Sequence, residues 1–293
     1  FLKMKIIILG CTGRLGNTIT KYFFGINDCE IYPIIRDYSK IKFFKQKYHE
    51  NFIGIKNFLD FSELRRVIEP LKADIIINCI GITNKFSSDK PFMIQEFIKI
   101  NSLFPHQLYQ VCSENNIRLI HFSTDCIFSG KKGSYSETDI PDPIDIYGKS
   151  KLLGELDYEN CITIRKSIIG HELSSKNGLL EWFIGQKEVV QGFKKVVFSG
   201  LTTLELSEIL EKYIIPSENL QGIINVTGKS ITKYELLKNI AKIYKKSINL
   251  KPDESVVIDR SLDGSKFSSL TGYTTKSWDD LIYAMHQFNM LNK

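Results

Sequence analysis

The sequence predicts an α/β protein built on a doubly wound parallel sheet, with a smaller, interleaved C-terminal lobe. In the first half of its 293 residues, apolar runs of strand length alternate with helical patterns, as in successive βαβ units. Residues 6–9 and 75–77 are apolar at every position, as strands buried on both faces require. A glycine-rich turn follows the first of these runs directly. Together the three features indicate a Rossmann-type sheet.

The expected elements follow in chain order. In the first half we expect strands at 4–9, 30–35, 52–56, 74–80, 117–123 and 161–165, and helices near 14–24, 38–48, 61–71, 91–115 and 145–158. Beyond about residue 165 the pattern loosens, with helices near 177–186, 203–213, 231–244 and 277–288 and strands at 195–198, 222–226 and 248–251. We therefore expect residues 1–166 to form the Rossmann domain and residues 167–293 to form mainly a second lobe, with some segments returning to the sheet.

The composition is that of an ordinary globular protein. Hydrophobic residues make up 43% and charged residues 25%, and the formal charge of +6 is dispersed without a basic tail. We therefore expect no nucleic-acid partner, whereas a basic pocket for a small anion fits this charge.

Cysteine usage and hydropathy predict the compartment. The six cysteines show no CxxC pair and no metal-ligand spacing, so we expect free thiols in a reducing environment and no metal site. No apolar run approaches the ~20 residues that a bilayer span needs, and no cleavable signal precedes the first strand. We expect a cytoplasmic protein without a membrane partner.

The glycine-rich turn is a candidate dinucleotide site. Glycines here permit a tight turn and let backbone amides approach a pyrophosphate at the N-terminus of the following helix. The motif alone is weak, but its position after a buried strand favours this interpretation over a plain turn. The candidate cofactor residues are Gly10, Thr12, Gly13, Arg14, Leu15 and Gly16.

Arg36 ends the second strand, where an NAD-selective site usually has a carboxylate for the ribose 2′-hydroxyl. An arginine suits a 2′-phosphate, so NADPH is the expected cofactor, with NADH as the alternative. The less favoured alternative is an exposed arginine that starts a helix. Asp60, after the third strand, could bind the adenine amine or simply cap a helix.

Two further segments are expected beside the cofactor. Cys79, Ile80 and Gly81 end the fourth strand at the sheet edge where a dinucleotide would pass, and Gly81 lets the backbone approach a ligand. Asn101 either fixes the geometry near the fifth strand or is a buried structural residue.

The residues expected to carry the chemistry lie between 123 and 151. Ser123 and Thr124 end the fifth strand, and after a loop Tyr147 and Lys151 stand four residues apart at the start of a helix. This spacing puts them on one helix face, one turn apart. A phenol beside an ammonium can act as an acid or base near neutral pH, because the positive charge favours the phenolate. Thr124 could add a hydrogen bond to the reacting oxygen. The segment predicts a nicotinamide-dependent oxidoreductase.

In this order the motifs resemble the extended short-chain dehydrogenase/reductases. Within them, residues 123–130 (Ser-Thr-Asp-Cys-Ile-Phe-Ser-Gly) and 147–155 are similar to dTDP-4-dehydrorhamnose reductases and related sugar-nucleotide reductases. The resemblance is close from residue 4 to about residue 166 and vague after it. Tyr-x-x-x-Lys also begins at Tyr38 and Tyr234, but only Tyr147 follows a suitable strand and loop.

The resemblance implies NADPH-dependent reduction of the C4 keto group of a nucleotide-activated 4-keto-6-deoxyhexose, in surface-polysaccharide precursor synthesis. Tyr147 would protonate the C4 oxygen while the cofactor delivers hydride. Lys151 would lower the pKa of Tyr147 and hold the nicotinamide ribose, and Thr124 would bind the carbonyl. The substrate would be a nucleotide-diphosphate sugar, and we expect a homodimer. Candidate substrate residues are Thr83, Asp125, Cys126, Arg165, His171 and Trp182.

Several assignments keep an alternative. Cys126 stands where these reductases usually have Tyr. We expect it to line the pocket as a small residue rather than to act as a reactive thiol. Arg165, Lys166 or His171 could meet a diphosphate or sugar, although a lone His after a strand is more often structural. Trp182 suits lobe packing better than sugar stacking. For the whole chain, the alternatives are an epimerase or dehydratase of the same superfamily and a non-catalytic NADP-binding regulatory subunit.

Overall fold

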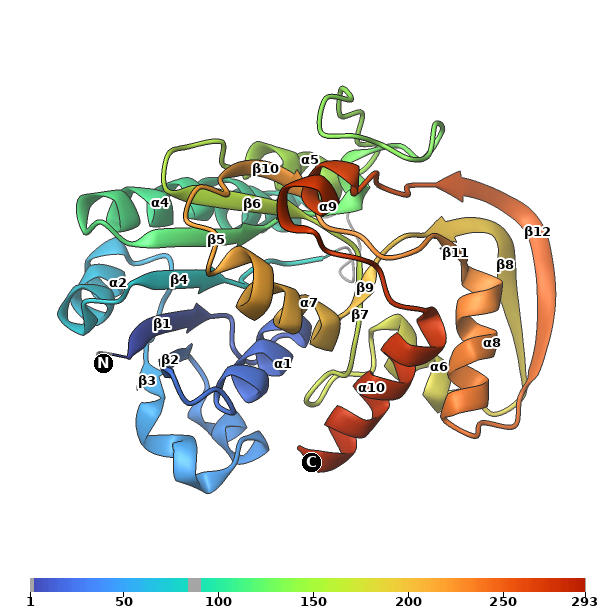
Figure 1. Ribbon diagram of the computed structural model, residues 1–293, viewed down its shortest axis with the longest axis horizontal. Coiled ribbons are helices and arrows are strands. Elements are labelled where there is room, and N and C mark those ends of the chain that lie inside the picture. Colours follow the sequence, from blue (N-terminus) through green and yellow to red (C-terminus); the bar gives the residue numbers. More distant parts are fainter. Residues whose placement is uncertain (1–2, 84–90, 293) are drawn as a thin grey trace.

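The computed structural model describes residues 3–83 and 91–292, and a seven-stranded sheet lies at the centre of this part (Figure 1). Its strands are all parallel, in the order β10-β6-β5-β4-β1-β2-β3, which confirms the predicted doubly wound α/β fold. The strands are β1 (Met4–Leu9), β2 (Cys29–Ile35), β3 (Ile53–Gly54), β4 (Ile75–Asn78), β5 (Arg118–Phe122), β6 (Cys161–Arg165) and β10 (Gly222–Asn225).

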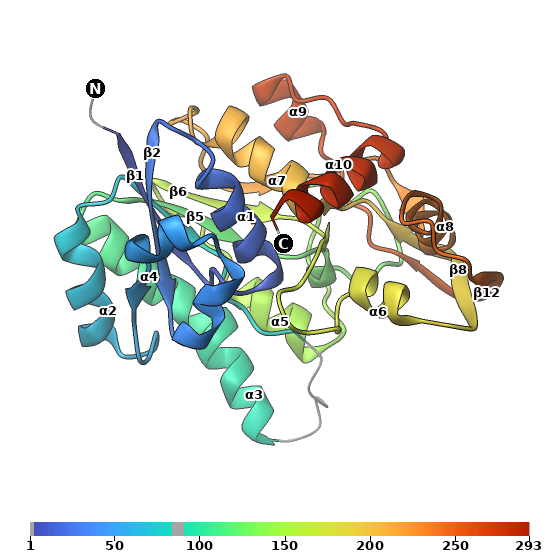
Figure 2. The same ribbon diagram turned by 90° about the horizontal axis from the view of Figure 1, so that it is seen from below.

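Helices cover both faces of this sheet (Figure 2). Along β1, Ile6 and Ile8 pack into one core while Ile7 and Leu9 pack into the other, which explains the continuous apolar run. The first core lies under α1 (Arg14–Phe23), α7 (Thr203–Ile209) and α9 (Ser265–Thr271), and the second under α2 (Phe61–Ile68) and α4 (Phe104–Glu114).

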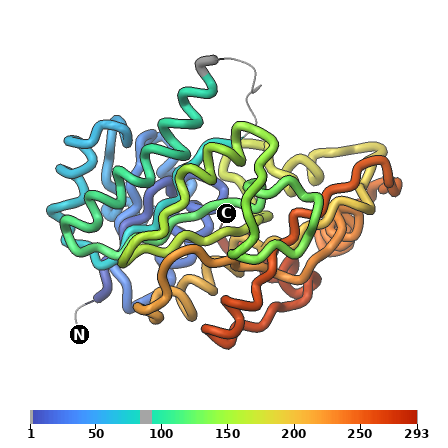
Figure 3. Tube along the Cα trace, turned by 90° about the horizontal axis from the view of Figure 1, so that it is seen from above, coloured from blue at the N-terminus to red at the C-terminus, as the bar shows by residue number. Residues whose placement is uncertain are grey.

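The helix expected near 91–115 is nearly continuous. It runs as α3 (Pro91–Phe97), the π turn η4 (Ile98–Leu103) and α4. α3 projects away from the body of the molecule, near α5 (Ile146–Leu153) (Figure 2 and Figure 3). No helix within residues 3–83 and 91–292 is long and apolar enough to cross a membrane.

A second lobe is built around a three-stranded sheet, in the order β11-β8-β12. Its core is shared by α6, α8 and α10, and β10 returns from this half of the chain to pair with β6 in the main sheet. β12 is much longer than the strand expected at 248–251. The elements are β7 (Ile168–Ile169), α6 (Leu179–Gly185), β8 (Val189–Phe198), β9 (Leu201–Thr202), β11 (Ile231–Thr232), α8 (Lys233–Ile243), β12 (Asn249–Asp259) and α10 (Trp278–Leu291).

The helix expected at 38–48 is the clearest departure from the prediction. The chain instead forms two 3₁₀ turns, η1 (Tyr38–Phe43) and η2 (Gln46–Asn51), joined by extended residues. Tyr48 stacks on Phe24 with ring centroids 4.2 Å apart and donates a hydrogen bond to its carbonyl oxygen at 2.7 Å. These tertiary contacts override the local helix preference. The remaining turns are the 3₁₀ turns η3 (Glu69–Leu71) and η5 (Asp125–Ile127) and the π turn η6 (Leu210–Ile214).

Candidate active site

The glycine-rich turn joins β1 to α1. Gly10 has φ +75°, and a Cβ there would lie 2.8 Å from the carbonyl carbon of Cys79. A Cβ on Gly16 would lie 2.2 Å from the carbonyl oxygen of Gly10, so α1 begins in direct contact with the turn. Gly13, at the N-cap of α1, provides no capping side chain, and the first amides of a helix attract anions. The turn therefore has the close main-chain packing that a pyrophosphate site needs.

Beside the turn lies a pocket of about 370 Å³. Arg36 and Lys40 line it together with Phe58, and the Arg36 guanidinium lies 5.7 Å from the Phe58 ring centre. The Asp37 carboxylate is also in the lining, but it accepts hydrogen bonds from the main-chain N and the hydroxyl of Ser39. This pocket therefore offers two cations to an anionic group.

The pocket continues into a second one of about 250 Å³, with which it shares Gly13 and residues 79–82. Thr83, Ser123, Tyr147 and Lys151 line this second part. The buried hydroxyl of Ser123 has no hydrogen-bond partner among the described residues, so a bound ligand could satisfy it. The two pockets form one groove, which brings the glycine-rich turn to the Tyr147/Lys151 pair and fits an extended dinucleotide.

Local contacts hold α5 against the end of β5. Asp145 caps the helix and accepts a hydrogen bond from the main-chain N of Gly148 at 2.7 Å. A Cβ on Gly148 would lie 2.2 Å from the carbonyl oxygen of Cys126, so the absence of a side chain permits this close approach. Lys151 Nζ donates a hydrogen bond to the carbonyl oxygen of Phe122 at 2.6 Å.

We expect Gly148→Ala to cost about 1–3 kcal/mol of unfolding free energy, because the added methyl group collides with main chain. Gly185→Ala is the matched control, since a Cβ there meets nothing within 4 Å. Urea unfolding of both variants measures the difference. Equal unfolding free energies for the two variants would show that the α5 contact tolerates a side chain.

Burial dominates the protonation of the central pair. It raises the pKa of Tyr147, with the Cys126 thiol adding to the effect and a hydrogen bond with Thr124 opposing it. Tyr147 therefore holds its proton near neutral pH, as a proton donor must. Burial, followed in importance by the nearby charge of Lys166, lowers the pKa of Lys151 to about 7. Burial, rather than the Lys151 ammonium, thus has the largest effect on the pKa of Tyr147.

Lys166 brings a second ammonium to the groove. It follows β6, lines the same part as Tyr147 and Lys151, and lies 5.9 Å from the ring centre of Phe122. Burial lowers its pKa to about 8, and Asp125 is the main charge that opposes this. Of the three candidates considered after the sixth strand, Lys166 is the one that the structure brings to the groove.

Apart from Gly16, described above, and from Asn101 and the turn residues Thr124, Asp125 and Cys126, described below, four candidates lie outside the groove lining. Arg165 forms a buried ion pair with Glu155, with both side chains 4% exposed, because a buried guanidinium needs a carboxylate. Asp60 caps α2 and accepts hydrogen bonds from its first amides. Trp182 on α6 is 41% exposed and lines neither part of the groove. His171 lines a different cavity.

Asn101 connects the loop after β4 to α5. Its amide N donates hydrogen bonds to the carbonyl oxygen of Ile82 at 2.9 Å and to the hydroxyl of Ser150 at 3.1 Å. Its amide oxygen accepts one from the main-chain N of Ile82 at 2.9 Å. Ile82 lines the groove and Ser150 precedes Lys151. These contacts therefore fit a role for Asn101 in positioning the groove wall relative to α5.

The turn after β5 faces two cations of the second lobe. The Thr124 hydroxyl accepts from the main-chain N of Cys126 at 3.2 Å and donates to Asp125 at 3.1 Å. Burial raises the pKa of Cys126 to about 12, which fits a pocket-lining thiol better than a reactive one. Arg260 Nη1 lies 3.8 Å from Cys126 Sγ. Burial lowers the pKa of Lys233 to about 8, and the neighbouring Asp125 opposes this most. No motif marked Lys233 or Arg260 in the sequence.

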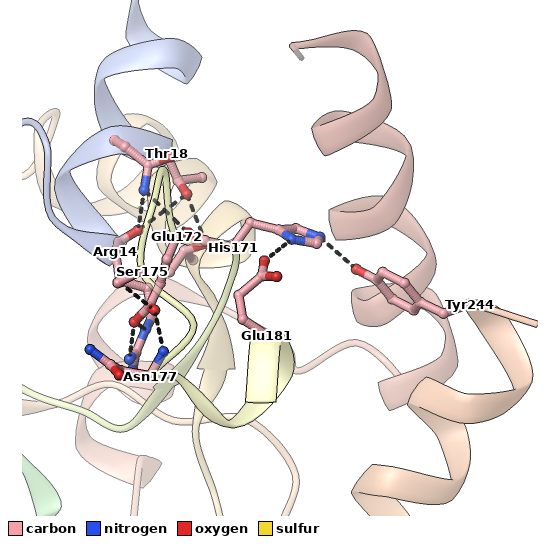
Figure 4. Close-up of polar contacts among 10 residues, drawn as sticks. Arg14, Thr18, His171, Glu172, Ser175, Asn177, Glu181 and Tyr244 are labelled. Carbon is pink, nitrogen blue, oxygen red and sulfur yellow. Dashed lines mark hydrogen bonds and ion pairs between the residues drawn. The ribbon is translucent and has the colours of Figure 1, made fainter. Parts of the chain in front are cut away.

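An ion pair ties the groove to the second lobe (Figure 4). Arg14 of the glycine-rich turn donates from Nε to Glu172 Oε1 at 3.0 Å. Glu172 also accepts hydrogen bonds from the hydroxyl of Ser175 at 2.6 Å and from the main-chain N of Asn177 at 2.9 Å. Both Arg14 and Glu172 line the groove, so the ion pair forms part of its wall.

Two curated relatives match the chain over about half of its length. A dTDP-4-dehydrorhamnose reductase from Aggregatibacter actinomycetemcomitans is 28% identical over 152 residues, which cover 52% of this chain and 45% of the relative. Methionine adenosyltransferase 2 subunit beta from Danio rerio is 29% identical over 153 residues, covering 52% and 42%. The matching part of the chain thus spans less than half the length of either relative.

The fold extends the similarity over nearly the whole chain. A dTDP-4-dehydrorhamnose reductase from Bacillus anthracis, solved in complex with NADP, superposes with a TM-score of 0.76 at 20% identity and covers 97% of this chain and 99% of its own. Residues 4–172, more than half of the chain, match the sequence profile of the RmlD substrate binding domain. This match confirms the resemblance that the motifs indicated: the chain belongs to the RmlD substrate binding domain family.

Proposed function

We propose that the protein is an NADPH-dependent reductase of the C4 keto group of a nucleotide-activated 4-keto-6-deoxyhexose, serving surface-polysaccharide precursor synthesis. The observation that carries the proposal is the single groove that joins the glycine-rich turn to Ser123, Tyr147 and Lys151. The reductase from A. actinomycetemcomitans supports the reaction class, and the NADP complex of the B. anthracis reductase supports the cofactor.

In this proposal residues 1–166 bind the dinucleotide along the groove. Its diphosphate meets the glycine-rich turn and Lys166, and its 2′-phosphate meets Arg36 and Lys40. Bound NADPH supplies the hydride. Tyr147, kept protonated by burial, donates its proton to the carbonyl oxygen as negative charge develops there. Lys151 then stabilises the remaining phenolate.

Residues 167–293 contribute most of the substrate contacts in the proposal. A nucleotide-diphosphate sugar carries two negative charges that need partners when they leave water. Lys233 and Arg260 reach the turn at Asp125 and Cys126 from the second lobe, which makes them the candidates for this diphosphate. Thr124, the N-cap of η5, is the candidate hydrogen-bond donor to the sugar carbonyl once its hydroxyl turns away from Asp125, to which it donates at 3.1 Å.

The test is NADPH oxidation against 4-keto-6-deoxy sugars linked to dTDP, UDP, GDP and CDP, followed by the loss of the reduced nicotinamide absorbance. Turnover with one member of the panel supports the reductase and identifies the nucleotide. NADPH binding without turnover of any sugar in the panel would contradict the reductase. That result would favour the second candidate function, described below.

Arg36→Gln is expected to weaken NADPH binding about 10- to 100-fold and to leave NADH binding unchanged, because only NADPH carries the 2′-phosphate. Fluorescence titration of both cofactors measures the effect. Lys56→Gln is the matched control, since this exposed residue lies outside the groove lining. An equal loss of affinity for NADPH and NADH would show that Arg36 does not bind the 2′-phosphate.

A second candidate function is a non-catalytic, NADP-binding regulatory subunit. The observation that favours it is the relative named as a subunit of methionine adenosyltransferase 2. Such a protein would bind NADPH, show no turnover with the sugar panel, and change the activity of a partner enzyme. The amount of NADPH consumed per sugar converted distinguishes the reductase from an epimerase or dehydratase of the same superfamily. Either of these enzymes returns the hydride to the sugar and therefore consumes no NADPH.

We also propose a homodimer, formed through an apolar face on α3, η4, α5 and the loop that follows α5. Ile94, Ile98, Leu103, Leu153 and Tyr158 are each between 40% and 64% exposed there. Large exposed apolar side chains grouped on neighbouring helices are typical of an interface.

Leu153→Glu is expected to convert the dimer to a monomer, because it buries a carboxylate in this face. Light scattering after gel filtration measures the mass. Leu270→Glu is the control, since Leu270 is similarly exposed but lies on α9. A wild-type monomer, or a dimer in both variants, would contradict the assignment of this face.

A further inference from the structure

A second cavity, of about 590 Å³, lies apart from the groove. One side of it comes from α1 and from the segment that includes the end of η1, and the other comes from the second lobe. We call it the lysine pocket and define it by Lys21, Lys42, Lys45, Phe43, Phe44, His171, Glu172, Glu181, Tyr244 and His286. Glu172 is the residue that its lining shares with that of the groove.

The pocket carries positive charge that its own walls do not balance. Within residues 3–83 and 91–292, no carboxylate lies within 4.0 Å of the ammonium groups of Lys21, Lys42 or Lys45. The two carboxylates in the lining already have partners: Glu172 holds Arg14, and Glu181 bonds to His171. Three ammonium groups therefore face a space in which, among the described residues, Glu181 is the one lining carboxylate without a lysine or arginine partner.

Lys21 is the most enclosed of these cations. Its ammonium donates one hydrogen bond, at 3.1 Å, to the carbonyl oxygen of Asn292, and lies 5.9 Å from the Phe44 ring centre. An ammonium can donate three hydrogen bonds, so Lys21 retains capacity for a ligand. Burial lowers its pKa, and the charge of Lys45 lowers it further. A bound anion near both lysines would stabilise the charged form of Lys21 and so oppose both effects on its pKa.

The opposite wall is polar and aromatic (Figure 4). His171 bonds to Glu181 through Nδ1 at 2.6 Å and to the Tyr244 hydroxyl through Nε2 at 2.8 Å. The rings of Tyr244 and His286 lie 4.3 Å apart between centroids. This hydrogen-bonded set presents ring faces and a hydroxyl, which suit the body of a small organic molecule.

We propose that the lysine pocket binds a phosphate-bearing small molecule. The phosphate contacts Lys21, Lys42 and Lys45, and the remainder of the molecule packs toward Tyr244 and His286. A phosphate matches the pocket because it supplies several acceptor oxygens and the negative charge that three ammonium groups lack. The site is distinct from the cofactor groove, and the inference does not depend on the proposed reductase activity.

Calorimetric titration of the full chain with inorganic pyrophosphate tests the proposal, and needs no turnover. In Lys166→Met, which weakens any pyrophosphate binding to the groove, we expect saturable binding to persist, and to weaken at least about tenfold when Lys42→Gln/Lys45→Gln is added. Lys42 and Lys45 are exposed, so their replacement should not disturb folding. Lys194→Gln/Lys195→Gln is the matched control, since these exposed lysines already pair with Glu254.

The other outcomes overturn the inference. Loss of binding in Lys166→Met alone would show that pyrophosphate enters the cofactor groove. Equal weakening in both double-lysine variants would show a non-specific effect of net charge. Absence of saturable binding to the wild-type chain would show that the lysine pocket is not a phosphate site.

Discussion

Tyr147→Phe is expected to lower turnover about 10³-fold while NADPH affinity stays within about a factor of two of wild type. The substitution removes the phenol hydroxyl, whose proton would go to the substrate carbonyl, and keeps the ring that lines the groove. Steady-state kcat and a fluorescence titration of NADPH measure the two quantities separately.

Tyr234→Phe provides the matched control for this prediction. Tyr234 and Lys238 have the same Tyr-x-x-x-Lys spacing, but they lie on α8 and outside the groove lining. Turnover should therefore be unchanged. Retained activity in Tyr147→Phe, or a similar loss in Tyr234→Phe, would show that Tyr147 is not the proton donor.

Lys166→Met is expected to weaken NADPH binding about 10- to 100-fold. Lys151 and Lys166 are the ammonium groups in the lining beside Tyr147, and the Glu172 carboxylate there already holds Arg14. A dinucleotide diphosphate with two negative charges would balance the two ammonium groups. Methionine keeps much of the length of the side chain and removes the charge, so the change in affinity reports electrostatics. Affinity equal to that of wild type would contradict a diphosphate contact.

The pH dependence of NADPH binding tests the same contact independently. Because the pKa of Lys166 is lowered to about 8, the free protein loses this charge as the pH rises past that value. A bound diphosphate raises the pKa, so the favourable interaction is complete below about pH 8 and fades as the pH rises through the higher pKa of the complex.

Lys166→Arg is the control variant for the pH profile. Lys151 has a pKa of about 7, so its loss of charge weakens NADPH binding at a lower pH, and it does so in both proteins. Arginine stays charged at high pH, so the variant should bind NADPH progressively better than wild type above about pH 8. Parallel profiles for the two proteins would exclude titration of Lys166 as the cause.

The main sheet could be predicted because its strands are buried on both faces. Ile75 and Ile77 pack into one core and Ile76 into the other, so the sequence is apolar at each of these positions. β12 lacks this signal. Most of its residues are exposed or half-buried, and its pairing with β8 comes from a distant segment. The pattern of the second lobe therefore depends on long-range packing.

The candidate site divides in a similar way. The glycine-rich turn, residues 79–82 and Ser123 follow strands of one parallel sheet, so their convergence at the C-terminal edge was predictable. Arg165 and Lys166 show the limit of this reasoning. Successive side chains along a strand point to opposite faces. Arg165 therefore forms a buried ion pair with Glu155, whereas Lys166, the next residue, lines the groove. Lys233 and Arg260 reach the site through the packing of the second lobe.

Transfer of deuterium from C4-deuterated NADPH to the sugar tests the central claim most directly. The sugar of the panel that supports turnover would be incubated with each stereospecifically labelled cofactor, and the product analysed by NMR and mass spectrometry. We expect one of the two labelled cofactors to deliver one deuterium to C4 of the sugar. The amount of labelled product should equal the amount of NADPH consumed. Tyr147→Phe should show no such transfer. Product without deuterium at C4, or consumption of NADPH without a reduced sugar, would contradict this claim.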